Sequence, residues 1–306
     1  MTVRHILEID DLTAEELQRV LVLAADPERP HLLAGRSVGL YFEKPSLRTR
    51  HSCEVAVVEL GGHPLTFRAE EVGSAEREPL DDIGRVLSGY HAVLGGRVYD
   101  HATLEGFAAG SSIPVVNLLS DLGHPCQAVA DLLTMQQRWG ELSGRTVCWI
   151  GDYNNVARSL SLAAAMTGMA MRIASPPGYG PTDVDVERLI AAGAPEAPYV
   201  TNRPPEAAKG ADAVHTDVWA SMGHEAEAEA RRQAFEGFSV DDEVMTAAAP
   251  DAVFMHCLPA HRGEEVTAAV VDGDQSVVFT QAHNRLHAFR GILRFLLEDP
   301  SNGGPS

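Results

Sequence analysis

The chain has 306 residues, of which 45% are hydrophobic and 22% are charged, a composition typical of a soluble globular protein long enough for two domains. Its formal net charge of −19 argues against a duplex nucleic-acid partner, which would favour a basic surface. The amino terminus lacks a leader pattern and the uncharged, apolar-leaning run 159–171 is too short for a bilayer, so we expect a cytoplasmic protein without a membrane partner.

Apolar runs and helical patterns alternate along the whole chain. This alternation is typical of parallel sheets with helical crossovers, and it predicts an α/β protein with two doubly wound parallel-sheet domains. The predicted strands are 36–42, 91–97, 113–119, 145–152, 171–176, 212–219 and 252–259. The predicted helices are 46–60, 127–139, 156–167, 241–247 and 283–297.

A polar stretch with two glycines, 138–145, marks the predicted junction between the domains. We expect the first domain to span 1–138 and the second 139–282. The last helix, 283–299, is expected to return to the first domain, and 300–306 to form a flexible tail. Because ligands of open parallel sheets bind at the carboxyl ends of the strands, the residues that follow each strand are the candidates for function.

The loop after the first predicted strand is the most basic stretch of this acidic chain. Residues 42–50 read FEKPSLRTR. Pro45 ends the strand and Ser46 is well placed to cap the next helix, whose free N–H groups would attract an anion. Arg48 and Arg50 could hold phosphate oxygens with paired N–H bonds. This stretch alone leaves a solvated helix start with an ordinary cap as an equal alternative.

Polar side chains also follow the later strands of the first half. Arg97 ends the strand 91–97, where a lone Arg is usually a surface residue. A Gly-His-Pro turn places His124 and Gln127 at the start of a helix. A neutral imidazole and an amide could bind a carbonyl and an –NH₂ group, although both side chains could instead satisfy the backbone of their own loop.

The second half offers three further loops. Two asparagines, 154 and 155, begin a helix after a strand that lacks the Gly-x-Gly-x-x-Gly pattern of a dinucleotide site. Asp217 with Ser221 would suit an ammonium group, although the same residues could form an ordinary turn. Cys257 follows a strand and is either a reactive thiol or an inert buried one; none of the four cysteines has C-x-x-C spacing, so no zinc site is expected.

Together these segments closely resemble the aspartate/ornithine carbamoyltransferase family, from about residue 33 to residue 296. Four motifs recur in the order found in that family: Ser-x-Arg-Thr-Arg at 46–50, His-Pro-Cys-Gln at 124–127, Asp-x-Trp-x-Ser-Met-Gly at 217–223 and His-Cys-Leu-Pro at 256–259. The last two motifs are those of the ornithine branch. Each motif lies in a loop where the site of an α/β protein is expected.

The resemblance implies a role for individual residues. As catalytic residues it implies Arg97, His124, Asp217 and Cys257. As the site for carbamoyl phosphate it implies Ser46, Leu47 through its backbone, Arg48, Thr49, Arg97, His124, Gln127, Cys257, Leu258 through its carbonyl, and Arg285. As the site for L-ornithine it implies Asn155, Asp217, Ser221 and Met222, with the segment after Met222 as a closing lid.

The implied reaction is carbamoyl transfer from carbamoyl phosphate to the δ-amine of L-ornithine, through a tetrahedral intermediate, in the cleft between the domains and without metal or cofactor. The resemblance further implies arginine metabolism and a homotrimer or multiple of trimers. Leu47 stands where the family has Thr, and Glu71 stands near a Gln that the family donates to a neighbouring subunit. The alternatives are a transcarbamylase for putrescine or an acylated ornithine, and a non-enzymatic anion- or protein-binding paralogue. A third alternative is a nucleotide-dependent enzyme that binds NAD or ATP, against which the missing Gly-rich loop argues.

Overall fold

The computed structural model describes residues 3–72, 78–220 and 227–298. It divides into two compact units, one formed by Met1–Leu133 with His283–Ser306 and the other by Thr134–Ala282, and each is described by itself. The predicted tail, 300–306, lies outside the described residues. Among the described residues, no helix combines the length and the apolar character that crossing a membrane requires.

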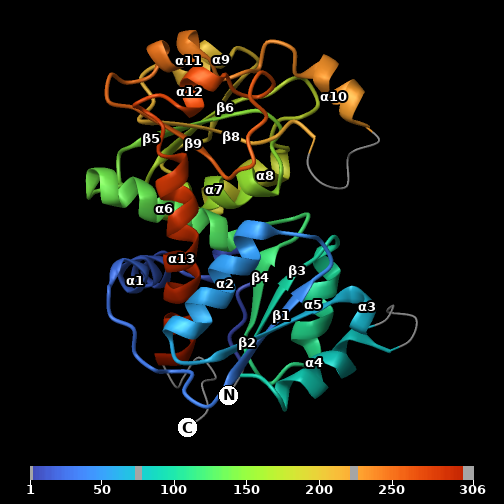
Figure 1. The fold of residues 1–306 in the computed structure, drawn as a ribbon. Coiled ribbons are helices and arrows are strands. Elements are labelled where there is room, and N and C mark those ends of the chain that lie inside the picture. The colour runs from blue at the N-terminus through green and yellow to red at the C-terminus, as the bar shows by residue number, and fades with distance from the viewer. Residues whose placement is uncertain (1–2, 73–77, 221–226, 299–306) are drawn as a thin grey trace. The chain divides into compact units, whose positions relative to one another are not determined.

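The first unit contains a 4-stranded parallel sheet in the order β2-β1-β3-β4 (Figure 1). Its strands are β1 (Ser37–Phe42), β2 (His63–Arg68), β3 (Val93–Arg97) and β4 (Val115–Leu119). Its helical elements are η1 (Ile9–Asp11), α1 (Ala14–Ala25), α2 (Leu47–Glu59), α3 (Ala69–Val72), α4 (Leu80–Ser88), α5 (His101–Gly110) and most of α6 (Pro125–Trp139). In Figure 1, α4 and α5 lie side by side along one side of this sheet, and α2 lies along the other.

The second unit contains a 5-stranded parallel sheet in the order β7-β6-β5-β8-β9. Its strands are β5 (Thr146–Ile150), β6 (Ala170–Ala174), β7 (Tyr199–Thr201), β8 (Ala213–Thr216) and β9 (Val253–His256). Its helices are α7 (Asn155–Met166), α8 (Asp183–Ala191), α9 (Pro204–Ala208), α10 (Ala228–Ala234), α11 (Asp242–Ala247) and α12 (Ala268–Val271); α13 (Val278–Glu298) begins here and continues in the first unit.

Each sheet is buried on both faces because helices cover both. The central strands read as continuous apolar runs, and every residue of β3, β8 and β9 is buried. The core of the first unit packs Tyr41 edge-on against Phe107, with ring centroids 5.3 Å apart. In the second unit, Trp219 stacks on Phe235 in a core that also contains Phe254.

The predicted α/β class with two doubly wound parallel sheets is confirmed, and each predicted strand overlaps an observed one. Two edge strands were missed. β2 carries a Pro and leaves most of its side chains partly exposed, and β7 is three residues long, so neither shows an apolar run. The predicted start of the last helix at 283 is wrong, because α13 begins at Val278.

Candidate active site

Both sheets have a switch point, where adjacent strands send the chain in opposite directions. In the first sheet this point lies between β1 and β3: β1 leads through α2 outward to β2, and β3 leads through α5 to β4. In the second sheet it lies between β5 and β8 for the same reason. Loops that diverge from neighbouring strand ends leave room for a ligand. The predicted site residues 46–49 and Arg97 follow or end the first pair, and Asp217 follows the second.

The helix α2 begins as the sequence predicted. Ser46 is its N-cap in extended conformation, and its hydroxyl accepts a hydrogen bond from the Thr49 N–H at 3.3 Å. Leu47, the departure from the family pattern, occupies the first helical position with its side chain 69% exposed. That side chain packs on little of the protein, so the backbone N–H is the group this position can offer to an anion.

Two buried guanidinium groups meet on the hydroxyl of Thr49. Arg285 donates to the Thr49 oxygen at 2.6 Å, and Arg97 donates to the same oxygen at 3.3 Å. All three residues are more than nine-tenths buried. Because a hydroxyl oxygen has two lone pairs, both are then occupied, and the Thr49 hydrogen remains available to donate to an incoming anion. Residues from α2, β3 and α13 thus form one cationic cluster.

Gln127 joins this cluster from α6. Its carbonyl oxygen accepts from Arg285 at 2.9 Å, and its amide nitrogen donates to the carboxylate of Asp131 at 2.8 Å. Asp131 is fully buried, one helical turn further along α6. It was not predicted as part of the site, although its i+4 spacing from Gln127 is visible in the sequence. The Asp131 carboxylate fixes which end of the Gln127 amide faces the guanidinium.

His124 is buried at the start of the same helix and is 2% exposed. Burial lowers its pKa well below 6.5, and the positive charges of Arg285 and Arg97 lower the pKa further. The imidazole is therefore neutral near pH 7, with one N–H donor and one acceptor nitrogen. A neutral donor beside two guanidiniums suits an oxygen that gains negative charge during a reaction.

The remaining cations of the 42–50 loop have different surroundings. Arg50 is exposed and donates to Glu54 on the same helix at 2.8 Å, so it faces away from the cluster around Thr49. The ammonium group of Lys44 is buried and lies 4.3 Å from the centre of the Tyr99 ring. Arg48 is half-buried at the second position of α2. Of these three cations, Arg48 is the one that lies between Ser46 and Thr49 in the sequence, and it therefore remains the candidate for the anion site.

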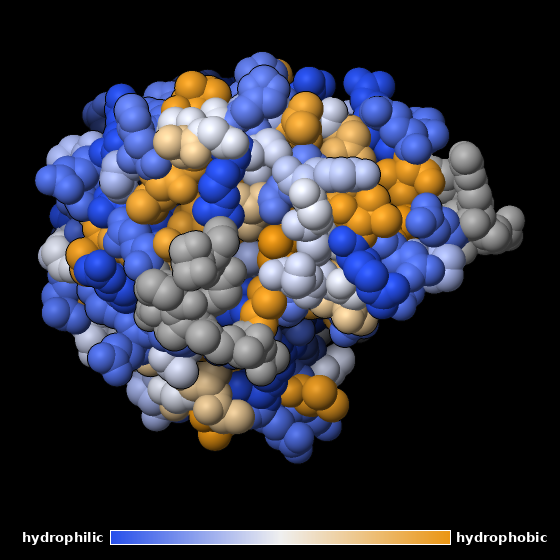
Figure 2. Space-filling view, turned by 90° about the horizontal axis from the view of Figure 1, so that it is seen from below, coloured by the Kyte–Doolittle hydropathy of each residue, from blue (hydrophilic) through white to orange (hydrophobic). Residues whose placement is uncertain are grey.

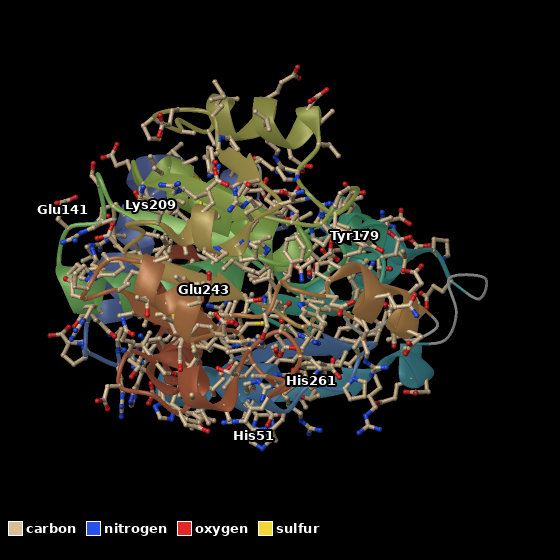
Figure 3. All side chains as sticks on the ribbon, turned by 90° about the horizontal axis from the view of Figure 1, so that it is seen from above. His51, Glu141, Tyr179, Lys209, Glu243 and His261 are labelled. Carbon is tan, nitrogen blue, oxygen red and sulfur yellow. The ribbon has the colours of Figure 1, made fainter. Side chains whose placement is uncertain are left out.

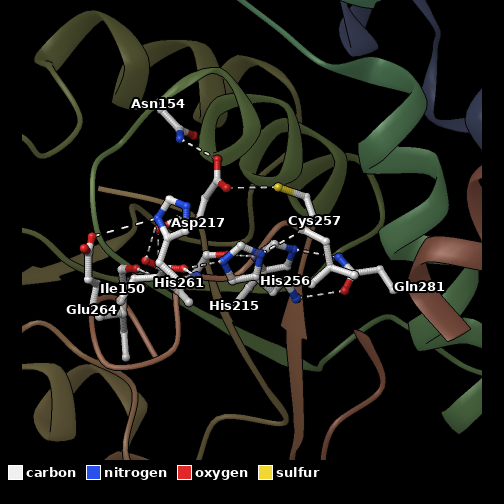
Figure 4. A network of polar contacts seen from close by, with 12 residues as sticks. Ile150, Asn154, His215, Asp217, His256, Cys257, His261, Glu264 and Gln281 are labelled. Atoms are coloured by element: carbon white, nitrogen blue, oxygen red, sulfur yellow. Dashed lines mark hydrogen bonds and ion pairs between the residues drawn. The ribbon is translucent and has the colours of Figure 1, made fainter. Parts of the chain in front are cut away.

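In the second unit, Asp217 connects two loops (Figure 4). One carboxylate oxygen accepts from the Cys257 thiol at 3.0 Å, and the other accepts from the Asn154 amide at 2.9 Å. Asp217 is buried and Cys257 is half-buried. The sequence prediction placed Asp217 and Cys257 in one site, and the structure brings their side chains into contact.

Asn154 was not predicted as a site residue, whereas Asn155 was. Asn154 is the N-cap of α7, and its amide oxygen accepts from the N–H groups of Val156 and Ala157. Its amide nitrogen is thereby directed to Asp217. Gly151, at φ 133, lets the chain turn sharply from β5 before this cap. Asn155 is the first residue of α7 and is half-buried.

The loop after β9 carries Cys257 between two unusual backbone positions. Leu258 has φ 60, in the left-handed region, and the Leu258–Pro259 peptide bond is cis. Two predicted ornithine-binding residues, Ser221 and Met222, lie outside the described residues, as does most of the proposed lid. Glu71 lies in α3, is exposed and accepts from the backbone N–H of Arg68 at 3.0 Å.

Two groups of side chains within the described residues have ligand atoms close enough for a metal ion. Asp217, His256 and Cys257 form one group, and His261, Glu264 and Glu265 form the other. In the first group, both ring nitrogens of His256 already take part in hydrogen bonds, one with the Leu258 N–H and one with Glu265. A metal would have to displace one of these bonds, so this group does not fit a resident ion.

Comparison with known proteins identifies the family. The profile of the carbamoyl-P binding domain of aspartate/ornithine carbamoyltransferase matches residues 4–137, and that of its Asp/Orn binding domain matches residues 143–296. The chain is 47% identical to an ornithine carbamoyltransferase of Acidothermus cellulolyticus over 99% of both chains. It is also 47% identical to that of Archaeoglobus fulgidus, covering 96% of this chain and 97% of the relative.

A solved structure gives the same result. The ornithine carbamoyltransferase from Pyrococcus furiosus superimposes with a TM-score of 0.90 at 42% identity, covering 96% of this chain and 97% of the other. The matched profiles span both units, and the four motifs lie within them. The chain belongs to the aspartate/ornithine carbamoyltransferase family.

Proposed function

We propose that this protein transfers the carbamoyl group of carbamoyl phosphate to the δ-amine of L-ornithine, giving L-citrulline and phosphate. The observation that carries the proposal is the cluster in which the buried guanidiniums of Arg97 and Arg285 meet on Thr49 at the start of α2. Such a cluster suits a small, strongly anionic substrate. The high identity to ornithine carbamoyltransferases over nearly the whole chain supports ornithine as the acceptor.

In the proposed mechanism, the first unit binds carbamoyl phosphate. The phosphate lies at the N-terminus of α2, where Ser46, the Leu47 N–H, Arg48 and Thr49 neutralise its charge. Arg97 and His124 donate to the carbamoyl oxygen. Gln127 and Arg285 complete this pocket, and the Gln127 oxygen, oriented by Asp131 and Arg285, accepts from the carbamoyl –NH₂ group.

The second unit binds ornithine. Asp217 attracts the ammonium group of its amino-acid end, with Asn155, Ser221 and Met222 as the other binding residues. The neutral δ-amine attacks the carbamoyl carbon, and a C–N bond forms. Negative charge then develops on the carbonyl oxygen, which faces Arg97 and His124. The C–O bond to phosphate breaks, the nitrogen loses a proton that the departing phosphate takes up, and phosphate leaves as an anion.

One contact of Cys257 and the backbone of its neighbour Leu258 support the proposed role of this loop. The thiol donates to Asp217, so it helps hold the carboxylate in position for the substrate's ammonium group. The adjoining carbonyl of Leu258 is held in an unusual direction by the left-handed backbone of that residue. In the proposed complex this carbonyl and the thiol also contact the carbamoyl end of the reaction.

The cellular setting follows from the family resemblance. We propose that the enzyme works in the cytoplasm as a homotrimer or a multiple of trimers and takes part in arginine biosynthesis. Cell fractionation tests the location. Arginine auxotrophy on deletion of the gene tests the pathway, and unimpaired growth without arginine would contradict it.

The deciding experiment is an assay for citrulline with the purified protein, carbamoyl phosphate and L-ornithine. Putrescine and N-acetyl-L-ornithine are offered in parallel, because a related transcarbamylase for either amine is the competing reading. We expect product from L-ornithine alone. Turnover with putrescine or the acylated amine but not with ornithine would disprove the proposal.

The phosphate site is tested by two arginines on the same helix. Arg48→Ala should lower kcat/KM for carbamoyl phosphate about 10²–10³-fold, since it removes one cationic donor to the substrate. Arg50→Ala is the matched control, because its guanidinium pairs with Glu54 at the surface, and it should stay within a few-fold of wild type. Equal losses in the two variants would refute the assignment.

A further inference from the structure

The backbone on both sides of Cys257 is held by side chains that the reaction itself does not use. The N–H of His256, the residue before it, donates to the Gln281 side chain at 2.8 Å. The N–H of Leu258, the residue after it, donates to Nδ1 of His256 at 2.8 Å. Figure 4 shows His256 and Gln281 together beneath the Asp217–Cys257 contact. The backbone N–H groups of the residues before and after Cys257 therefore each have a fixed acceptor.

These contacts determine the tautomer of His256. Because Nδ1 accepts from a backbone N–H, it must carry a lone pair, and in the neutral ring the proton must then be on Nε2. Nε2 lies 3.3 Å from an oxygen of Glu265 and can donate to it. The other tautomer would direct an N–H of the ring at the N–H of Leu258 and could not hold that peptide.

Glu265 is fully buried, and the same carboxylate oxygen has a second donor. It accepts from the backbone N–H of His261 at 2.5 Å. His261 begins the far side of the turn that starts at Leu258 and Pro259, and Figure 3 labels it in this loop. The same Glu265 oxygen thus bonds to His256, at the start of the loop, and to the N–H of His261, at its end. The adjacent Glu264 faces the surface, where it pairs with Arg232.

We infer that Glu265 is a positioning residue for the reaction. It maintains the Nε2–H tautomer of His256, which holds the Leu258 peptide, and it secures the returning end of the same loop. The result is a fixed direction for the Cys257 thiol toward Asp217 and a fixed direction for the Leu258 carbonyl. The carboxylate of Glu265 does not contact substrate and takes no proton. This inference rests on the proposed role of Cys257, Leu258 and Asp217 in binding and transfer.

A positioning role and a charge role both predict a loss in Glu265→Leu, but they differ in what they predict for Glu265→Gln. Glu265→Gln keeps the shape and an acceptor oxygen for His256 and His261, but removes the charge. Glu265→Leu keeps approximate volume and removes the acceptor. For Glu265→Leu we expect kcat to fall about 10²-fold, the loss typical of a displaced reacting group. For Glu265→Gln we expect kcat within a few-fold of wild type. Glu264→Leu is the control and should match wild type.

KM and thiol reactivity provide readouts that a general loss of structure would not produce. KM for carbamoyl phosphate should stay within a few-fold in Glu265→Leu, because the residues proposed to bind the phosphate are held in the first unit. Alkylation of Cys257 by iodoacetamide should become faster, since a thiol that is no longer held against the Asp217 carboxylate is more accessible to the reagent. The other three cysteines are buried, and Cys257→Ala gives the background rate.

Each outcome decides the inference. A wild-type kcat and a wild-type alkylation rate in Glu265→Leu would overturn the inference. A fall in kcat in Glu265→Gln as large as that in Glu265→Leu would also overturn it, because it would indicate that the charge of Glu265 is needed. If Glu265→Leu fails to fold by circular dichroism, Glu265→Gln decides alone by its kcat. The alkylation assay needs no substrate, and absence of citrulline with wild type would reject the proposed function, not the positioning role.

Discussion

The neutrality of His124 is the clearest consequence of the structure for a single residue. Its pKa is lowered by burial and by two neighbouring guanidiniums, whereas in the unfolded chain it would return to about 6.5. Below pH 6.5, His124 therefore binds a proton in the unfolded state but not in the folded state. The stabilising contribution of this residue is complete above pH 6.5 and is lost as the pH falls from there toward the lowered pKa.

This sign gives a prediction for His124→Gln, which keeps a polar side chain that does not titrate. Between pH 6.5 and pH 5.5, the free energy of unfolding of wild type should fall more steeply than that of the variant, by at most about 1.4 kcal/mol per pH unit, the slope for one proton. Urea denaturation at several pH values measures it. His5, His91 and His287, whose pKa values are also lowered by burial, are common to both proteins. Parallel slopes would contradict the prediction.

The site residues show which side chains a motif comparison can bring together. Arg97, Gln127, Thr49 and Arg285 were predicted for one site, and their side chains contact one another in one cluster, while their part in binding stays a prediction. Asn155 was chosen over Asn154, yet Asn154 is the residue bonded to Asp217. The two asparagines are adjacent, and the local pattern alone does not tell which one caps the helix and which one is its first residue.

At the scale of one element, α2 unites a helix cap with a proposed ligand site. The Ser46 hydroxyl accepts from the Thr49 N–H, and the next helical N–H groups are those proposed to meet phosphate. The helix is therefore expected to depend on this residue for stability as well as for binding. A second helix, α1, offers a comparison, because the Thr13 hydroxyl caps it by accepting from Glu16.

We predict that Ser46→Ala and Thr13→Ala each lower the free energy of unfolding by about 1 kcal/mol, the usual loss for an N-cap. Urea denaturation measures this loss. The two variants should differ in their KM for carbamoyl phosphate. We expect this KM to rise severalfold in Ser46→Ala and to stay unchanged in Thr13→Ala. A shared rise in KM would show that the effect comes from general destabilisation and would remove Ser46 from the proposed site.

The elements that escaped prediction have a common physical reason. β2 and β7 are edge strands with much exposed surface, so they lack the apolar run that reveals a central strand. The start of α13 was missed because Val278 and Phe279 precede a polar stretch that includes His283 and Arg285. Several of those polar residues, Gln281 and Arg285 among them, are buried by partners distant in the sequence.

At the scale of the whole molecule, the proposed trimer requires a surface that a second copy can cover. Figure 2 shows hydrophilic residues over much of the face that it presents, interrupted by separate hydrophobic patches. In the first unit, α2 and its neighbour β2 expose Val55, Val58 and Leu65 by 44%, 59% and 46%. We propose that these three side chains belong to the surface that a second copy covers.

We predict a mass near three times the 32.8 kDa of one chain, or a multiple of that, in sedimentation equilibrium. Val58→Asp should dissociate the assembly, because it places a charge in an apolar contact. Val184→Asp, on α8 of the second unit and 72% exposed in wild type, is the control and should remain assembled. A monomeric wild type, or assembly unaffected by Val58→Asp, would contradict the predicted contact.

The amino-acid sequence by itself determined the α/β class, the doubly wound parallel sheets, the cap at Ser46 and the loops proposed to carry the chemistry. These follow from local periodicity, turn residues and short motifs, each of which acts within a few residues. Only the tertiary structure decided that Asp131 orients Gln127, that Asn154 reaches Asp217, and that Glu265 holds the turn after Cys257 through His256. The last two of these contacts join residues from different loops or elements. All three depend on burial, because a buried polar group needs a hydrogen-bond partner. A local sequence pattern does not show which residue that partner will be.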